Sequence, residues 1–94
     1  MALKIEWDTK KANSNKKKHG ITFEEAGTLL SDSLSITIPD PLNLGNEERF
    51  VTIGQSDRQR TLVVVHTERG DVIRLISARL ENANERKRYE ESYG

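Results

Sequence analysis

The sequence of 94 residues contains no cysteine, only two histidines and two prolines, and 5% aromatic residues. Without cysteine, disulfide bonds, zinc–thiolate sites and thiol catalysis are excluded. The two histidines cannot form a metal site by themselves, and we expect no cofactor. No run approaches the roughly 20 apolar residues needed to span a bilayer, and the N-terminus lacks the apolar segment of a signal peptide. We therefore expect a cytoplasmic protein that does not contact a membrane.

Composition favours one folded domain over residues 1–94. Hydrophobic residues make up 34% and charged residues 32% of the chain, which leans polar but keeps clear apolar runs. A chain of this length buries a single core.

Charge is distributed in blocks, although the net charge is zero. Residues 1–20 sum to +4, residues 21–48 to −6, residues 49–79 to +3 and residues 80–94 to −1. Such a chain can present a basic face to nucleic acid and an acidic region to a basic partner, although charge blocks are most often solvated faces.

A short strand and a helix are predicted at the N-terminal end. Residues 3–7 form the strand, and Asp8 or Thr9 is an N-cap residue for a helix that runs to about Lys18. Gly20 ends this helix. Its apolar content is low, so we expect it to lie on the surface of the fold.

A second helix and a short strand follow. Thr22 and Glu25 form a capping box, and the apolar residues after it share one face of a helix that ends near Asp32. Residues 35–38 form a strand. The loop of residues 39–46 contains both prolines and is expected to be exposed.

The C-terminal half is typical of an antiparallel meander that ends in a helix. Strands are predicted at residues 50–54, 61–68 and 72–79, and a weakly apolar helix at about 81–92. The order β-α-α-β-β-β-β-α indicates an α+β two-layer domain with a mostly antiparallel sheet. We expect four strands in the sheet, the first two helices on one face, and a partly open, concave second face.

The hairpin of residues 66–79, HTERGDVIRLISAR, carries more ionisable side chains than packing explains. We interpret its arginines as facing an anionic ligand, RNA, or a tight ion-pair network. A two-residue turn would mix Arg74 with Val63 and Val65 and place Arg79 beside His66. A three-residue turn sorts polar from apolar side chains better and is our prediction. It gathers His66, Glu68 and Arg74 on one face.

These side chains could cleave RNA without a metal. The reaction needs a base, cationic stabilisation of the phosphorane and an acid. The candidate base is Glu48 or Glu68, the candidate acid is His66 or His19, and the phosphate clamps are Arg49, Arg74 and Arg79.

Each of these roles has a simpler alternative. The same charges could form solvated cross-strand pairs. Arg79, between a strand and a helix, could instead form an ion pair with Glu81, Glu85 or the acidic second helix. A basic patch could track the RNA backbone or merely complement the helix dipole; it consists of Lys16, Lys17, Lys18 and His19.

A known family shares a set of residues spread over nearly the whole chain. The blocks KHGI at residues 18–21 and ISAR at residues 76–79 are together highly specific. The other shared positions are Trp7-Asp8, Asn15, residues 23–26, Asp32, Glu48-Arg49, Gly54, residues 62–65, Thr67, Arg69, Arg74, Glu85-Arg86 and Tyr89. In this pattern the chain resembles the BrnT toxins of bacterial type II toxin-antitoxin modules.

The resemblance implies a RelE-like ribonuclease fold and metal-free RNA cleavage that inhibits translation and growth. It also implies neutralisation by a BrnA-like ribbon-helix-helix antitoxin, with DNA contacted only through the complex. The active-surface candidates that it implies are Lys18, His19, Glu48, Arg49, Arg69, Arg74 and Arg79. Relatives often have Tyr at position 66, so a role for His66 rests on chemistry alone. The alternatives are a noncatalytic module of the same fold and a plain RNA-binding domain.

Overall fold

The computed structural model describes residues 4–40 and 48–93. Residues 41–46 of the predicted exposed loop lie outside the described residues. Of the predicted loop residues inside them, Pro39 is exposed and Asp40 is half-buried. In the described residues, no helix is long and apolar enough to cross a membrane.

Five strands form one mixed sheet in the spatial order β1-β5-β4-β3-β2. Their bounds are β1 (Lys4–Trp7), β2 (Ile36–Pro39), β3 (Arg49–Gln55), β4 (Thr61–Arg69) and β5 (Val72–Leu80). The three pairs among β2 to β5 are antiparallel, whereas β1 pairs with β5 in parallel. The prediction of a four-stranded sheet was therefore wrong. The first strand faces the core with Ile5 and Trp7, and it adds to the free edge of β5.

The helices are α1 (Thr9–His19), α2 (Phe23–Thr28) and α3 (Ala83–Tyr93), and a short 3₁₀ helix, η1 (Leu29–Ser31), continues α2. The predicted caps are confirmed. The Asp8 carboxylate accepts from the Lys10 N–H at 2.7 Å, and the Thr22 hydroxyl accepts from the Glu25 N–H at 3.2 Å. Gly20 ends α1 with a φ of +74°, a conformation that favours glycine.

Glu25 has a different partner from the one that a capping box provides. Its buried carboxylate accepts hydrogen bonds from the Ser56 hydroxyl at 2.7 Å and from the Arg60 guanidinium. The Arg60 hydrogen bond holds the pKa of Glu25 below its usual range. This ion pair connects α2 to the turn between β3 and β4.

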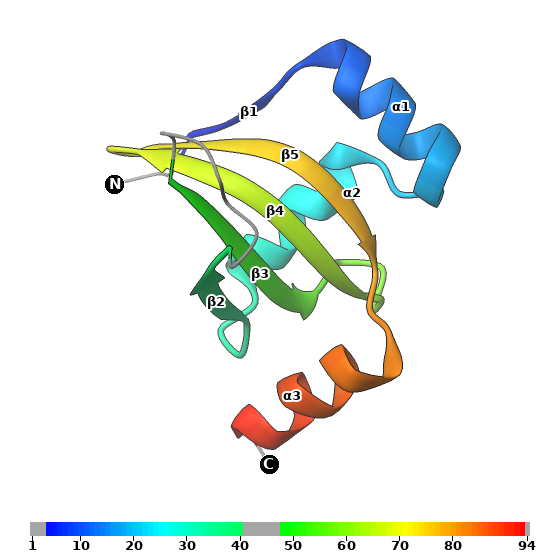
Figure 1. Cartoon of the computed structure of the whole chain (residues 1–94), viewed down its shortest axis with the longest axis vertical. Helices are drawn as coiled ribbons and strands as arrows, with labels where there is room; N and C mark the ends of the chain where they lie inside the picture. Colours follow the sequence, from blue (N-terminus) through cyan, green and yellow to red (C-terminus); the bar gives the residue numbers. More distant parts are fainter. Residues whose placement is uncertain (1–3, 41–47, 94) are drawn as a thin grey trace.

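Two clusters of apolar side chains lie on opposite faces of the sheet. The larger lies under α1, α2 and η1, where Phe23, Ala26 and Leu29 pack on Leu62, Val64 and Leu75. The smaller lies under α3, where Tyr89 packs on Ile53 and Val63. Helices α1 and α3 lie at opposite ends of the molecule (Figure 1). Helix α3 covers only part of the face that carries the smaller cluster, and we call this face the open face.

The hairpin between β4 and β5 has the two-residue register, not the three-residue register predicted from the sequence. Arg69 pairs with Val72, so the turn has two residues. Gly70 has a φ of +58°, which matches the positive φ that primed hairpin turns require. Further along, His66 pairs with Leu75 but Val65 pairs with Ser77, so β5 has a bulge at Ile76.

The bulge explains why the three-residue turn was the wrong prediction. Before it, Leu75 faces the helices; after it, Ala78 does so and Arg79 faces the opposite side. A bulge therefore allows a two-residue turn and good apolar sorting together. The two-residue turn pairs Arg74 with Thr67 on the open face, whereas His66 shares the helix-bearing face with Leu62 and Val64. The predicted grouping of His66, Glu68 and Arg74 is therefore wrong.

Candidate functional site

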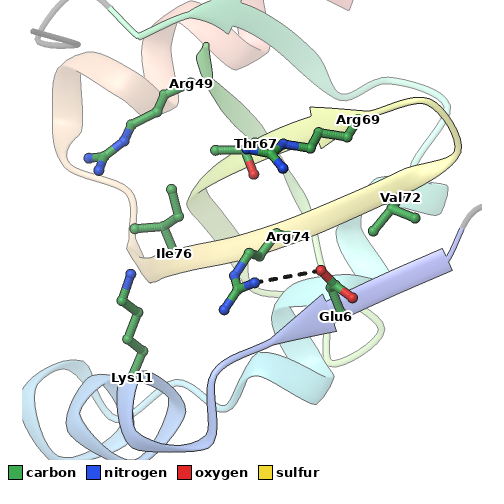
Figure 2. Close-up of a pocket in the computed structure, with 8 residues that line it drawn as sticks. All are labelled: Glu6, Lys11, Arg49, Thr67, Arg69, Val72, Arg74 and Ile76. Carbon is green, nitrogen blue, oxygen red and sulfur yellow. Dashed lines mark ion pairs between the residues drawn. The ribbon is translucent and has the colours of Figure 1, made fainter. Parts of the chain in front are cut away.

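A hollow of about 290 Å³ lies on the open face of the sheet, beside the β4–β5 turn. Four cationic side chains line it and one carboxylate does, so we call it the cationic hollow. Its lining residues are Glu6, Lys11, Arg49, Thr67, Arg69, Val72, Arg74 and Ile76 (Figure 2).

Strand register aligns four of these residues in one row across the sheet. Glu6 of β1 pairs with Arg74 of β5, Arg74 pairs with Thr67 of β4, and Thr67 pairs with Arg49 of β3. Neighbouring strands lie about 4.8 Å apart, so directly paired residues project side by side from the same face. We call this set the cross-strand row. Lys11 reaches the hollow from α1, which begins directly after β1 (Figure 2).

The charge of the hollow suits an anion. Arg74 Nη1 lies 3.7 Å from Glu6 Oε1, and the two side chains are 50% and 43% exposed. An ion pair this exposed is weak, so an incoming phosphate can compete for the guanidinium. Arg49 is exposed and forms no ion pair with any residue in the described ranges. Positive charges gathered in a hollow attract and orient a phosphate group.

A second hollow, of about 350 Å³, adjoins the first, and we call it the α1 hollow. The two share Lys11 and Ile76. The remaining lining residues of the α1 hollow are Lys10, Ser14, Asn15, Lys18, His19 and Ser77. Lys16 and Lys17 are exposed on α1 but line neither hollow. The predicted basic patch therefore divides, and only Lys18 and His19 border the hollows.

His66 lies far from the role predicted for it. Its side chain is fully buried on the helix-bearing face of the sheet and stacks on Phe50 at 6.0 Å between ring centroids. Nε2 shares a hydrogen bond of 2.7 Å with the Thr52 hydroxyl, and Nδ1 lies 3.7 Å from Glu68. Burial lowers the pKa of His66. A neutral ring with no route to the open face cannot meet a substrate held by Arg74.

Arg79 is engaged in the ion pair that was the alternative to a phosphate clamp. Its two Nη atoms donate to the Glu85 carboxylate at 2.8 and 2.6 Å, and this hydrogen bonding raises the pKa of Arg79. Glu85 and Asn82 also cap the start of α3 reciprocally. Arg79 thus holds α3 to the end of β5. Glu48 is exposed just before β3 and does not line the cationic hollow.

Three polar residues that line the cationic hollow were not candidates for the site from sequence: Glu6, Lys11 and Thr67. Glu6 alternates with the apolar Ile5 and Trp7, a pattern that indicates an outward-facing side chain. Its neighbour, however, is 68 residues away and depends on strand order. Lys11 is one of six lysines before Gly20, and nothing in the local sequence distinguishes it.

A small α+β domain with an open cationic sheet face belongs to the class of proteins that bind polyanions. Residues 7–85 match the family model described as "Ribonuclease toxin, BrnT, of type II toxin-antitoxin system". The chain therefore belongs to the BrnT family, as its sequence blocks predicted, and it is a ribonuclease toxin of a type II toxin-antitoxin system. Membership implies an RNA target and an antitoxin partner.

A solved structure supports this assignment. The chain is similar to the ribonuclease toxin BrnT of Brucella abortus, known from a crystal structure at 1.1 Å resolution. The TM-score is 0.63 at 25% sequence identity, over 86% of this chain and 99% of that chain. No curated protein sequence matches the chain.

Proposed function

We propose that this toxin holds the scissile phosphate of an RNA strand in the cationic hollow and cleaves it there without a metal ion. The cross-strand row carries the proposal, because it projects Arg49 and Arg74 from one face with Arg69 beside them. Guanidinium groups hold phosphate oxygens through paired hydrogen bonds. Preorganised cations also stabilise the charge that develops on the phosphorane.

The α1 hollow extends this surface for a longer RNA. Because the two hollows share Lys11 and Ile76, a strand bound in the first can continue past Lys18 and His19. Lysines along a groove neutralise successive phosphates. Single-stranded RNA fits best, since an open strand can follow a bent surface and expose its 2′-hydroxyl groups.

The first experiment compares arginines inside and outside the cationic hollow. Arg49→Gln and Arg74→Gln are each expected to lower the rate of RNA cleavage in EDTA by roughly 10²–10³-fold, the usual cost of losing one such contact. Arg58→Gln is the matched control, because Arg58 is exposed in the β3–β4 turn and lines neither hollow. Full cleavage by both hollow variants would refute the proposal.

A second comparison tests the path along α1. Lys18→Gln is expected to weaken binding of a long RNA more than Lys16→Gln or Lys17→Gln, which remove the same charge outside the hollows. The difference should shrink as salt rises, because phosphate contacts are screened. Equal losses in the three variants would indicate a diffuse charge effect and no defined path.

We also propose the partner and the setting of the reaction. The antitoxin is a BrnA-like ribbon-helix-helix protein, DNA is contacted only through the toxin–antitoxin complex, and the toxin acts in the cytoplasm. The fold is grouped with RelE-like ribonucleases. Family membership supports these assignments. Co-expression with such an antitoxin should restore growth and yield a complex that binds operator DNA, whereas purified toxin alone should not bind that DNA specifically.

A further inference from the structure

Glu6 places a carboxylate at one end of the cross-strand row. Among the described residues that line the cationic hollow, Glu6 is the one carboxylate. Its side chain is 43% exposed, and within the described residues its ion-pair partner is Arg74 at 3.7 Å. A carboxylate opposes phosphate binding electrostatically, so its place among four cations calls for a role that offsets that cost.

The ammonium group of Lys11 lies on the other side of Arg74 from Glu6 (Figure 2). Figure 2 shows the head group of Arg74 between those of Glu6 and Lys11, which come from β1 and α1. RNA cleavage by its own 2′-hydroxyl is an in-line displacement, so the attacking and leaving oxygens lie on opposite sides of the phosphorus. A base and an acid on either side of a phosphate-binding arginine match that geometry.

We propose that Glu6 is the general base and Lys11 the general acid of this ribonuclease, an assignment that rests on the proposed function of the cationic hollow. The Glu6 carboxylate takes the proton of the 2′-hydroxyl, and the 2′-oxygen forms a bond to phosphorus. The bond from phosphorus to the 5′-oxygen breaks, and that oxygen takes a proton from the Lys11 ammonium group. The products are a 2′,3′-cyclic phosphate and a 5′-hydroxyl. Water then returns a proton to Lys11 and removes one from Glu6, so no co-reactant is consumed.

The experiment measures single-turnover cleavage of a labelled single-stranded RNA in EDTA. Glu6→Gln and Lys11→Met are expected to lower the rate by roughly 10²–10⁴-fold, the usual contribution of general acid–base catalysis. Glu24→Gln and Lys87→Met are matched controls, since both side chains are exposed outside the cationic hollow. Binding of the 2′-O-methylated RNA, which cannot react, should be retained or strengthened in Glu6→Gln.

Two readouts separate this assignment from a positioning role for Glu6. A general base must be deprotonated, so the cleavage rate falls at low pH. This fall, the acid limb of the pH–rate profile, should disappear in Glu6→Gln and return in Glu6→Asp. An RNA with sulfur in place of the 5′-bridging oxygen needs no acid, so it should restore the rate in Lys11→Met but not in Glu6→Gln. If Glu6 only orients Arg74, the limb remains in Glu6→Gln, and the base assignment is overturned.

The outcomes distinguish this inference from the proposed function. Loss of cleavage in Arg49→Gln and Arg74→Gln with normal rates in Glu6→Gln and Lys11→Met would overturn the acid–base pair and leave the phosphate site standing. Normal rates in all four variants would overturn both.

Discussion

Asn15→Ala is expected to lower the free energy of unfolding by about 3 kcal/mol, because hydrogen bonds from Asn15 join α1 to the edge of β5. Its Nδ2 donates to the Ile21 and Ala78 carbonyl oxygens at 3.0 and 2.9 Å, and its Oδ1 accepts from the Ala78 N–H at 3.0 Å. Pairing between β1 and β5 ends at Leu75, so Asn15 takes the place of a strand at Ala78.

The magnitude follows from the three backbone groups that the substitution leaves unpaired. A buried polar group without a partner costs about 1–3 kcal/mol. Asn15 is 6% exposed but borders the α1 hollow, so water can reach the space left by the side chain and the low end of that range applies. A loss of this size is a large part of the roughly 5–15 kcal/mol that stabilises a domain, yet it leaves the protein folded.

Urea denaturation of Asn15→Ala and Asn13→Ala is the assay. Asn13 is exposed on the same helix, so its substitution should change stability by less than about 0.5 kcal/mol. Asn15→Asp keeps the acceptor for Ala78 but sets a carboxylate against two carbonyl oxygens, so this variant should gain stability as pH falls and the acid protonates. A loss below about 1 kcal/mol in Asn15→Ala would refute this account of α1 docking.

Three further predictions concern side chains away from the hollows. Arg79→Met should cost about 1 kcal/mol in thermal unfolding, since its ion pair with the start of α3 is partly exposed, and it should reduce cleavage far less than Arg74→Gln. Burial holds the pKa of His66 below its usual 6.5, so the stability it contributes is complete above that pH and is lost as pH falls below it; His66→Gln should remove this part of a pH titration of unfolding. In Gly54→Ala, the added Cβ would lie 2.9 Å from Ser35 Cβ, so the melting temperature should fall, whereas Gly27→Ala meets only ordinary contacts in α2 and should not lower it.

Local chemistry made the elements predictable. Asp8 and Thr22 cap helices because their side chains accept hydrogen bonds from backbone N–H groups of the first turn, which have no partner within the helix. Gly20 ends α1 because it adopts a positive φ. Alternating apolar residues identified β4 and β5, because successive side chains of a strand point to opposite faces of the sheet. The family was also recognisable, since KHGI and ISAR are each an unbroken run of four residues that can be read directly from the chain.

The site was only partly predictable. Arg49, Arg69 and Arg74 were predicted from their strands, and the structure brings all three to the cationic hollow. His66 was grouped wrongly with Arg74 because the sequence favoured a three-residue turn, whereas the structure has a two-residue turn. The bulge at Ile76 then shifts the register of β5 by one residue, and Arg79 forms the ion pair with Glu85 that the sequence left as an alternative. A one-residue shift exchanges the two faces of a strand, and no local signal in the sequence marked where the shift occurs.

The sequence by itself determined the helices, the strands and the family, because caps, turns and alternation act between residues a few positions apart. Only the tertiary structure decided which side chains share the cationic hollow. Glu6 and Arg74 are 68 positions apart, and they meet because β1 joins the sheet in parallel beside β5. Strand order and register depend on how the whole core packs, so the composition of the cross-strand row is a property of the fold as a whole.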